Sequence, residues 1–378
     1  MITWRAGTVQ SIRDQWAGVV VLDVAVSEPD ATGAAADLLR PAIAYTDLVG
    51  SPAPGDRVLL NTAAQTRGLG TGGMALVVAL PDRLPVDPAP GPGHIVKARY
   101  TPLQDMVLGV DEQESPHHAL LAEADSIAGM PVIVADLHSA VPAIIAGLRA
   151  ECGAPPRVVY VMTDGGALPI AFSRTVRGLR DAEWIAGAVT VGQAFGGDLE
   201  AVNVHTGLLA ARLVLQADVA IVSQGPGNLG TGTRWGFSGT SAGEAINASA
   251  ALGGHSIASL RVSEADARAR HRGVSHHSRT AYGRVALTPA DLPVPMLDGA
   301  LGDRIDEQAD EIVRISSGRM HRVDVPTEGL DEALRACPVP LRTMGRDLAT
   351  DRASFITAAV AGRHAAGVLD VGSAQAEG

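Results

Sequence analysis

Five side chains in this sequence could carry acid–base or metal chemistry: Lys97, Asp136, His138, Asp164 and His205. A carboxylate binds protons and cations, an imidazole titrates near neutral pH, and a desolvated amine can act as a base. Asp136 and His138 are separated by one residue, so both could point the same way from the end of a strand. We expect these five residues to be the catalytic candidates.

Lys97 stands out because it is the single lysine beside 29 arginines. Two interpretations stay open. A codon bias that replaces lysine by arginine could have spared one residue by chance. Alternatively, the position requires a compact, deprotonatable amine that a planar guanidinium cannot replace.

Glycine-rich loops provide a second kind of candidate. Residues 223–239 follow the apolar run 217–222 and precede a helix expected over 241–251. Such a loop turns tightly and presents backbone N–H groups to an anion. A glycine pair before a helix expected over 199–216, with Asp198 as its N-cap, makes a similar arrangement. The expected ligand- or cofactor-binding residues are Gly196, Gly197, Asp198, Gly225, Gly227, Asn228, Gly230, Thr231, Gly232 and Thr233.

Histidine pairs at 117–118 and 276–277 each follow a serine that could cap a helix. Adjacent residues do not share a helix face, so we expect at most one of each pair to enter a site. Hydrogen bonding to loop carbonyls is the alternative role. Further metal donors would be Asp198, Glu200, Glu264, Asp266 and His271. No established metal-binding spacing accompanies them, so the metal and the cofactor stay unknown. Arg268, Arg270 and Arg272 offer fork-shaped donors to an anion near the mouth of the site.

The hydrophobic pattern predicts an α/β protein in two parts. Short β-branched runs at 8–12, 18–26, 42–48, 56–61 and 74–80 predict a small N-terminal β-barrel-like domain. Apolar strands at 131–135, 157–162, 186–191, 218–222 and 256–260 alternate with helical segments, which predicts a doubly wound, mainly parallel sheet. We expect domains at 1–90 and 91–370 and a disordered tail at 371–378.

The polar loops after the five apolar strands should meet at one place, because parallel strands deliver their carboxyl ends to one edge of a sheet. They cover residues 136–139, 163–167, 195–200, 224–239 and 261–266. We therefore expect one composite ligand site at that edge.

Charge and hydropathy limit the partners. The net charge is −11 with acids and arginines interspersed, which argues against nucleic acid and anionic membranes. No apolar run reaches the roughly 18 residues that span a bilayer. The first residues lack the order of a signal peptide, so we expect a cytoplasmic protein.

Several motifs together resemble a known family. They are His94-Ile-Val-Lys97, Val110-Asp-Glu-Gln-Glu-Ser-Pro-His-His118, Met162-Thr-Asp-Gly-Gly166, Gly192-Gln-Ala-Phe-Gly-Gly-Asp198 and the loop from Gln224 to Gly239. The sequence resembles, over nearly its whole length, a bacterial family described only as a domain of unknown function. This resemblance implies no activity, cofactor or catalytic residue.

Three functions are compatible with these residues. The first is an enzyme that acts on a small anionic metabolite, phosphate- or carboxylate-bearing, held by the glycine loops. The second is a non-catalytic metabolite sensor. The third is a structural or assembly protein, a homodimer for example, whose glycine loops pack at a subunit interface. The loops do not match a Walker A motif, and the Rossmann and nucleophile-elbow spacings lack their structural context.

Overall fold

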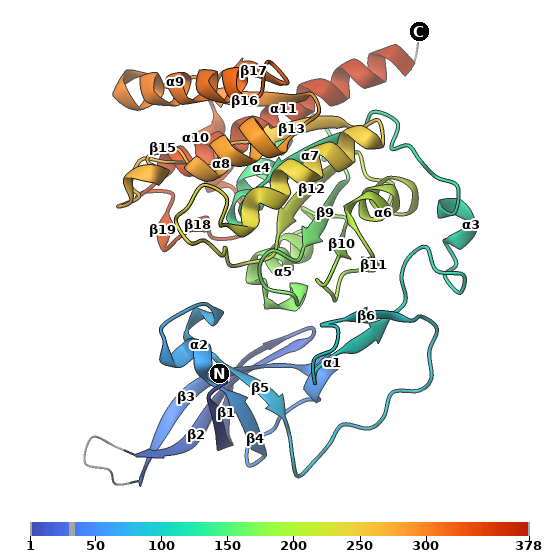
Figure 1. Cartoon of the computed structure of the whole chain (residues 1–378), viewed down its shortest axis with the longest axis vertical. Coiled ribbons are helices and arrows are strands. Elements are labelled where there is room, and N and C mark those ends of the chain that lie inside the picture. Colours follow the sequence, from blue (N-terminus) through green and yellow to red (C-terminus); the bar gives the residue numbers. More distant parts are fainter. Residues whose placement is uncertain (1, 30–34, 377–378) are drawn as a thin grey trace. The chain divides into compact units, whose positions relative to one another are not determined.

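The computed structural model describes residues 2–29 and 35–376 of the chain. It divides into two compact units (Figure 1). The first unit comprises Met1–Pro92 and Ala98–Asp105, and the second comprises Gly93–Lys97 and Met106–Gly378. The short segment around Lys97 thus belongs to the second unit, although residues 98–105 return to the first.

In the described part of the first unit, five strands form a closed barrel in the order β1-β2-β3-β5-β4. The strands are β1 (Trp4–Trp16), β2 (Val19–Pro29), β3 (Ala35–Tyr45), β4 (Arg57–Asn61) and β5 (Ala75–Ala79), with short helices α1 (Thr46–Val49), α2 (Ala63–Thr66) and η1 (Thr71–Gly73). The pair β3–β5 is parallel, and the other pairs are antiparallel. Alternate residues such as Leu22 and Leu60 fill the interior. The predicted small barrel is confirmed.

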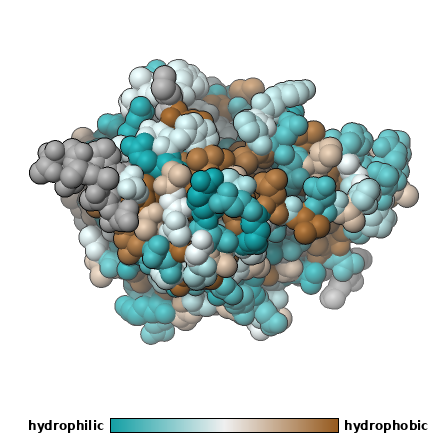
Figure 2. Space-filling model, turned by 90° about the horizontal axis from the view of Figure 1, so that it is seen from below, coloured by the Kyte–Doolittle hydropathy of each residue, from teal (hydrophilic) through white to brown (hydrophobic). Residues whose placement is uncertain are grey.

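The barrel unit also exposes apolar side chains. Trp4 is 47% exposed and Leu39 is 58% exposed. Hydrophobic and hydrophilic residues are interspersed on the face that Figure 2 shows. Scattered apolar side chains of this kind are usual on a protein surface and carry no site by themselves.

The second unit is built on an eight-stranded sheet in the order β11-β10-β9-β12-β8-β13-β16-β17, in which neighbouring strands are parallel (Figure 1). The strands are β8 (Pro131–Ala135), β9 (Val158–Thr163), β10 (Gly187–Val191), β11 (Leu199–Ala201), β12 (Val219–Gln224), β13 (His255–Ser259), β16 (Ala290–Pro295) and β17 (Met320–Val325). The predicted parallel sheet is confirmed. Its central strands are continuous apolar runs because helices cover both of their faces.

Two hydrophobic cores lie on the two faces of the sheet. Along β8, Val132 and Val134 contribute to one core and Ile133 to the other, as the strand period of two requires. One face is covered by α6 (Val204–Leu209), α7 (Ser241–Ala251), α8 (His276–Thr280) and α9 (Gly299–Ile315), and the other by α4 (Val141–Glu151), α5 (Arg174–Asp181), α10 (Leu330–Arg335) and α11 (Arg352–Ala376). The unit is therefore a three-layer α/β/α arrangement.

Smaller elements connect these layers. They are β6 (Ile95–Lys97), β7 (Asp105–Val107), α3 (His118–Leu121), η2 (His138–Ala140), η3 (Ile170–Phe172), η4 (Ala210–Val214), η5 (Ser238–Thr240), β14 (Val262–Ser263), η6 (Ala269–His271), β15 (Gly273–Val274), η7 (Ala281–Val285), β18 (Arg342–Thr343) and β19 (Arg346–Asp347). Among the described residues, no helix has both the length and the apolar character that crossing a membrane requires.

The prediction of a helix over 199–216 that begins at Asp198 is wrong. Residues Leu199–Ala201 form strand β11, which pairs in parallel with β10. The helix α6 begins later, where the Asn203 side chain accepts a hydrogen bond from the Thr206 N–H at 3.0 Å. Leu-Glu-Ala favours a helix locally, but pairing with the sheet edge overrides that weak preference.

At the other end of the chain, α11 continues to Ala376. Helix therefore covers most of the segment 371–378 for which we expect disorder, and residues 377–378 lie outside the described part.

The sheet has a topological switch point between β8 and β13. These strands are neighbours in the sheet. After β8 the chain continues to β9, which lies on one side of this pair, and after β13 it continues to β16, which lies on the other side. The loops after the two strands consequently diverge and leave a crevice at their carboxyl ends. Ligands of open α/β sheets bind in such crevices.

Candidate functional site

The loops at the carboxyl edge of the sheet contact one another, as we expect. Gly225 after β12 donates its N–H to the carbonyl of Thr163 at the end of β9 (3.1 Å), and Ala167 donates to Pro226 (2.7 Å). The Gln224 side chain donates to the backbone carbonyl of Asp136 after β8 (2.8 Å). The parallel pairing of β8, β9, β10, β12 and β13 places all five loops at this edge.

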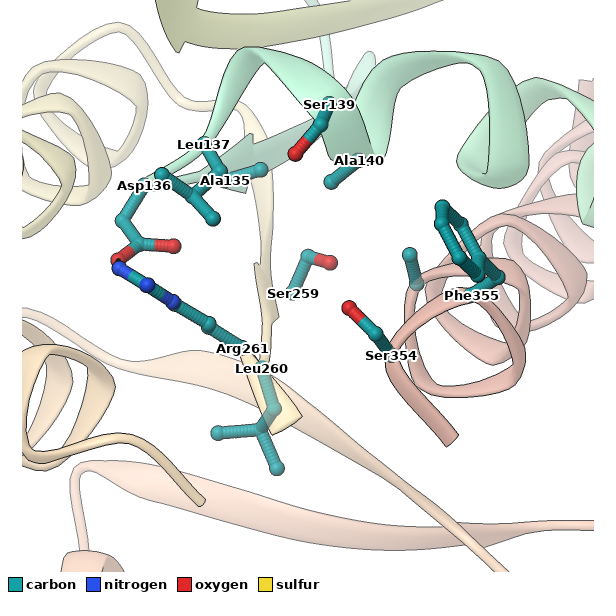
Figure 3. A pocket seen from close by; sticks show the side chains of 11 residues that line it. Ala135, Asp136, Leu137, Ser139, Ala140, Ser259, Leu260, Arg261, Ser354 and Phe355 are labelled. Carbon is teal, nitrogen blue, oxygen red and sulfur yellow. Dashed lines mark ion pairs between the residues drawn. The ribbon is translucent and has the colours of Figure 1, made fainter. Parts of the chain in front are cut away.

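Asp136 lies at the switch point with its carboxylate buried. The side chain is 2% exposed, and its Oδ2 atom has no hydrogen-bond partner. Arg261, after β13, approaches that oxygen to 3.7 Å, and His277 Nδ1 of α8 approaches it to 3.6 Å. Figure 3 shows the carboxylate of Asp136 and the guanidinium of Arg261 pointing toward each other, and both residues line a cavity of about 20 Å³. Segments from three parts of the unit thus bring a carboxylate, a guanidinium and an imidazole together.

The imidazole of His277 belongs to a group of three. His271, His276 and His277 each offer a ring nitrogen within 4.8 Å of the others, and their ring centroids are 4.4–5.0 Å apart. Phe237 stacks flat on the His277 ring at 3.8 Å. The Nδ1 atom of His271 bonds to Ser275 Oγ at 2.8 Å, and Arg261 donates to His277 Nδ1 at 3.1 Å. The Nε2 atom of His276 is buried without a partner.

The surroundings of this histidine cluster, defined as His271, His276 and His277, keep at least two of its imidazoles neutral. Burial lowers the pKa of His271 to about 3, with a further contribution from the charge of Arg261. Burial likewise lowers the pKa of His276 to about 4. Desolvation acts in this direction because it penalises the charged form. At neutral pH these rings are therefore unprotonated, and each has a ring-nitrogen lone pair that can accept a hydrogen bond or bind a metal.

An arginine-rich cavity of about 270 Å³ opens beside the cluster. It is lined by Gly232, Arg234, Arg270, His276, Arg279, Thr280, Arg284, Glu311 and Ile315. Arg279 is paired with Glu311. Among the described residues, Arg234, Arg270 and Arg284 have no carboxylate within ion-pair distance. Three exposed, uncompensated guanidinium groups on one cavity form a local positive region in a chain of net charge −11.

The glycine loop, residues 225–239, runs past both features. Gly227 (φ +93°) and Gly232 (φ +81°) have the left-handed backbone that favours glycine, and the Cβ position at Gly227 meets no atom within 4 Å. In the described structure, the N–H groups of Gly227 and Asn228 donate to no protein acceptor. Gly227 and Asn228 line a cavity of about 240 Å³ together with His138, Ser139 and Arg342. The first part of the loop therefore has two N–H donors without protein acceptors, on residues that line a cavity.

Other parts of the loop are used for packing. A Cβ at Gly225 would lie 2.4 Å from the carbonyl of Ala167, and one at Gly236 would lie 2.2 Å from Thr231 Oγ1. The N–H of Thr231 donates to Gly236 at 2.7 Å, and the Thr231 and Thr233 hydroxyls bond to each other at 3.0 Å. These glycines allow close approach of chain segments within the unit rather than contact with a ligand.

His138 lines the 240 Å³ cavity, but both of its ring nitrogens are engaged. Tyr160 Oη bonds to its Nδ1 at 3.0 Å, and Ser173 Oγ bonds to its Nε2 at 2.7 Å. Because Tyr160 donates to the carbonyls of Ser223 and Gln224, its oxygen accepts from Nδ1–H, and Ser173 donates to Nε2. Burial lowers the pKa of His138 to about 4. The ring is thus a neutral link in a hydrogen-bond chain.

Lys97 reaches the carboxyl edge at β10 and β11, where it is saturated. Its ammonium donates to the carbonyls of Gly192 (2.9 Å) and Ala194 (2.8 Å) and pairs with Glu200 at 3.1 Å. The neighbouring turn is also internally bonded, since Gly196 donates to Glu200, Gly197 to Thr190 and Asp198 to Ala188. Asp198 itself pairs with Arg180 at 2.7 Å. These groups hold the turn after β10 and leave none of its three N–H donors free for an anion.

Asp164 and His205 lie apart from the histidine cluster. Asp164 is exposed after β9 and accepts the N–H of Gln193 at 2.8 Å. His205 is exposed on α6. In the sheet order, β9, which precedes Asp164, is two strands away from β8, which corresponds to roughly 10 Å. Of the five predicted catalytic residues, the structure therefore places only Asp136 beside the cluster, with His138 two residues farther along.

Comparison with known proteins identifies the family of this chain. The family described as "Protein of unknown function (DUF3866)" matches residues 41–362. The chain belongs to this family. No curated protein matches the chain, and no solved structure matches it.

Two parts of this DUF3866 site have recognisable signals in the sequence, namely the histidine pair and the arginines of the cavity. Ser275 caps α8 as expected, because its side chain accepts the His277 N–H at 3.2 Å. Both His276 and His277 belong to the cluster, so the expectation that at most one of this pair enters a site is wrong. Two adjacent residues in a first helical turn can both reach His271, which approaches from the preceding loop. Of the cavity's arginines, Arg270 is among those that the sequence predicts near the mouth of the site. The sequence analysis does not include Arg279 and Arg284, although their spacing from His276 places them on one helix face.

Proposed function

We propose that this chain binds a small anionic metabolite at the carboxyl edge of its parallel sheet and acts on it as an enzyme. The observation that carries the proposal is the 270 Å³ cavity on which Arg234, Arg270 and Arg284 lie without carboxylate partners. Arginine presents planar, paired N–H donors that match phosphate and carboxylate oxygens. Phosphate is favoured as the ligand group because its oxygens can accept hydrogen bonds from several guanidinium groups at once.

Acid–base chemistry would come from the neighbouring buried groups. Asp136 carries a buried carboxylate oxygen without a hydrogen-bond partner, and neutral imidazoles lie between it and the arginine cavity. Buried, unpartnered titratable groups beside a cavity are typical of active sites. A sensor would need the arginines but not this acid and these imidazoles.

The experiment that tests anion binding is calorimetric titration of the full chain with inorganic phosphate and pyrophosphate. Arg270→Ala combined with Arg284→Ala should weaken binding at least tenfold, which is about 1.4 kcal/mol. The matched control is Arg335→Ala, because Arg335 is exposed on α10, which covers the opposite face of the sheet. Equal affinities in the wild type, the double variant and the control would refute the proposal.

Turnover separates an enzyme from a sensor. The chain is incubated with a panel of phosphate monoesters and diphosphates, and products are followed by phosphorus NMR. An enzyme converts at least one compound that it binds, and Asp136→Asn abolishes that conversion while binding is retained. Binding of the whole panel without conversion would favour the sensor.

A further inference from the structure

We propose that His271, His276 and His277 bind a divalent transition metal ion, with Zn²⁺ the best-suited ion. One ligand nitrogen from each residue lies within 4.8 Å of the other two. Side-chain nitrogens about 3.3 Å apart surround a zinc ion in a regular site, so small rotations of the rings suffice. This site is independent of anion binding and concerns the metal alone.

The ring nitrogens are available for this role. His276 Nε2 is buried and has no hydrogen-bond partner, which is costly unless something occupies the space in front of it. His271 uses only Nδ1 for Ser275, which leaves its Nε2 for a ligand bond. The Phe237 ring fixes the plane of His277 by stacking. Three rings held by different contacts converge without bonding to one another.

The residues behind the rings fit those found around metal-bound histidines. Such a histidine donates its second ring N–H to a carboxylate, hydroxyl or carbonyl. Ser275 Oγ occupies that place for His271 at 2.8 Å. For His277 the group is Asp136 Oδ2, which lies 3.6 Å from Nδ1 and has no hydrogen-bond partner. When the metal takes Nε2, the proton of His277 moves to Nδ1 and faces Asp136, and Arg261 transfers its contact from Nδ1 to the carboxylate.

The charges around the cluster decide which ions can bind. Arg261 and Arg270 oppose any cation, and the carboxylate of Asp136 offsets part of that repulsion. Mg²⁺ and Ca²⁺ prefer oxygen ligands and would not overcome this field with three nitrogens. Zn²⁺, Co²⁺, Ni²⁺ and Cu²⁺ bind imidazole strongly. Selectivity for this group of metals follows from the ligand type.

A second histidine group serves as an internal control. His255 and His364 also lie near one carboxylate, that of Asp291. There, however, each Nε2 already bonds to Asp291, at 2.6 and 2.7 Å. These rings have partners in the metal-free state, so we expect the histidine cluster and not this group to bind the ion.

The test is titration of the metal-free full chain with Zn²⁺, and with Co²⁺ followed by visible absorption. The expected result is one ion per chain and a Co²⁺ spectrum of a nitrogen-ligated site. His276→Gln, at a partly exposed ring, should weaken Zn²⁺ binding at least a hundredfold, whereas His364→Gln should leave it within twofold. Circular dichroism must show that both variants are folded, and His271→Gln provides a second removal of a ligand if one of them is not.

Three results would overturn the proposal: no binding of Zn²⁺ at micromolar concentration, unchanged binding in His276→Gln, or loss of binding in His364→Gln. The arginine variants used for phosphate keep all three imidazoles. These variants should therefore lose phosphate binding and keep Zn²⁺ binding. A wild-type chain that binds phosphate but not Zn²⁺ refutes the metal site alone, and one that binds Zn²⁺ but not phosphate refutes anion binding alone.

Discussion

Lys97 and Glu200 form a buried ion pair, with the ammonium 3.1 Å from the carboxylate and the lysine side chain 1% exposed. Burial raises the pKa of Glu200, and the charge of Lys97 opposes that rise. The same ammonium ties together the carbonyls of Gly192 and Ala194, so the pair fixes the turn after β10. This contact gives the single lysine of the chain a structural role.

Removal of Lys97 should destabilise the second unit strongly. Lys97→Met leaves the carboxylate of Glu200 buried without a counter-charge, which typically costs about 3–5 kcal/mol. Lys97→Met combined with Glu200→Gln should recover a substantial part of this loss, because both charges are gone. Urea unfolding followed by circular dichroism measures both free energies. A Lys97→Met protein as stable as the wild type would show that the pair contributes nothing.

Lys97→Arg tests whether the compact amine matters. The acceptors around the ammonium are the carbonyls of Gly192 and Ala194 and the carboxylate of Glu200, and a planar guanidinium cannot place its donors on the same three groups. We expect Lys97→Arg to lower the free energy of unfolding well beyond the effect of an exposed substitution such as Arg335→Lys. Equal stability of the two variants would favour survival of the lysine by chance.

The free energy of unfolding of the second unit should decrease as the pH falls, and His138 should contribute to that decrease. Its pKa is lowered to about 4 in the folded state, whereas an unfolded histidine titrates near 6.5. Between these values the unfolded chain binds a proton that the folded chain does not, so stability is lost as pH falls from about 6.5 to 4, by about 3 kcal/mol at most. Below pH 4 this contribution stays constant.

His138→Gln isolates that contribution. The variant is less stable at neutral pH because it loses contacts to Tyr160 and Ser173, but its stability should change less between pH 6.5 and 4. His205→Gln is the control, since His205 is exposed on α6. The measurement is the free energy of unfolding of the wild type, His138→Gln and His205→Gln at several pH values. Parallel curves for wild type and His138→Gln would contradict the assigned protonation state.

Two glycines of the loops should respond differently to alanine. A Cβ at Gly166 would lie 2.2 Å from the carbonyl of Gly225, so Gly166→Ala forces the loops apart and should cost about 3 kcal/mol or more. Gly227→Ala meets no atom but strains a backbone at φ +93°, for about 1–2 kcal/mol. Thermal unfolding of the two variants shows which substitution destabilises the protein more. If Gly227 also presents its N–H to an anion, Gly227→Ala weakens phosphate binding, and Gly166→Ala does so only where it unfolds the loop.

The sequence predicts the sheet better than the site. The five strands β8, β9, β10, β12 and β13 are continuous apolar runs, which is the direct signature of burial on both faces. The edge strand β11 is three residues long and has no such signature, so it was mistaken for helix. The contact of Asp136 with Arg261 depends on which strands are neighbours, and strand order is not readable from local composition. His271 and His277 likewise meet where the chain passes through β15 into α8, and this path depends on the pairing of β15 with β14.

The carboxylate of Asp136 should control metal affinity through His277. Asp136→Asn keeps the shape of the side chain but replaces the charge that faces Nδ1 at 3.6 Å. Loss of such an outer carboxylate typically weakens metal binding 10–100-fold. Zn²⁺ affinity is measured by competition with a chelator, with Asp164→Asn as the control because Asp164 is exposed after β9. Tighter binding in Asp136→Asn would show that Arg261 holds the carboxylate too firmly for it to support the imidazole, and unchanged binding would show that His277 takes its second hydrogen bond elsewhere.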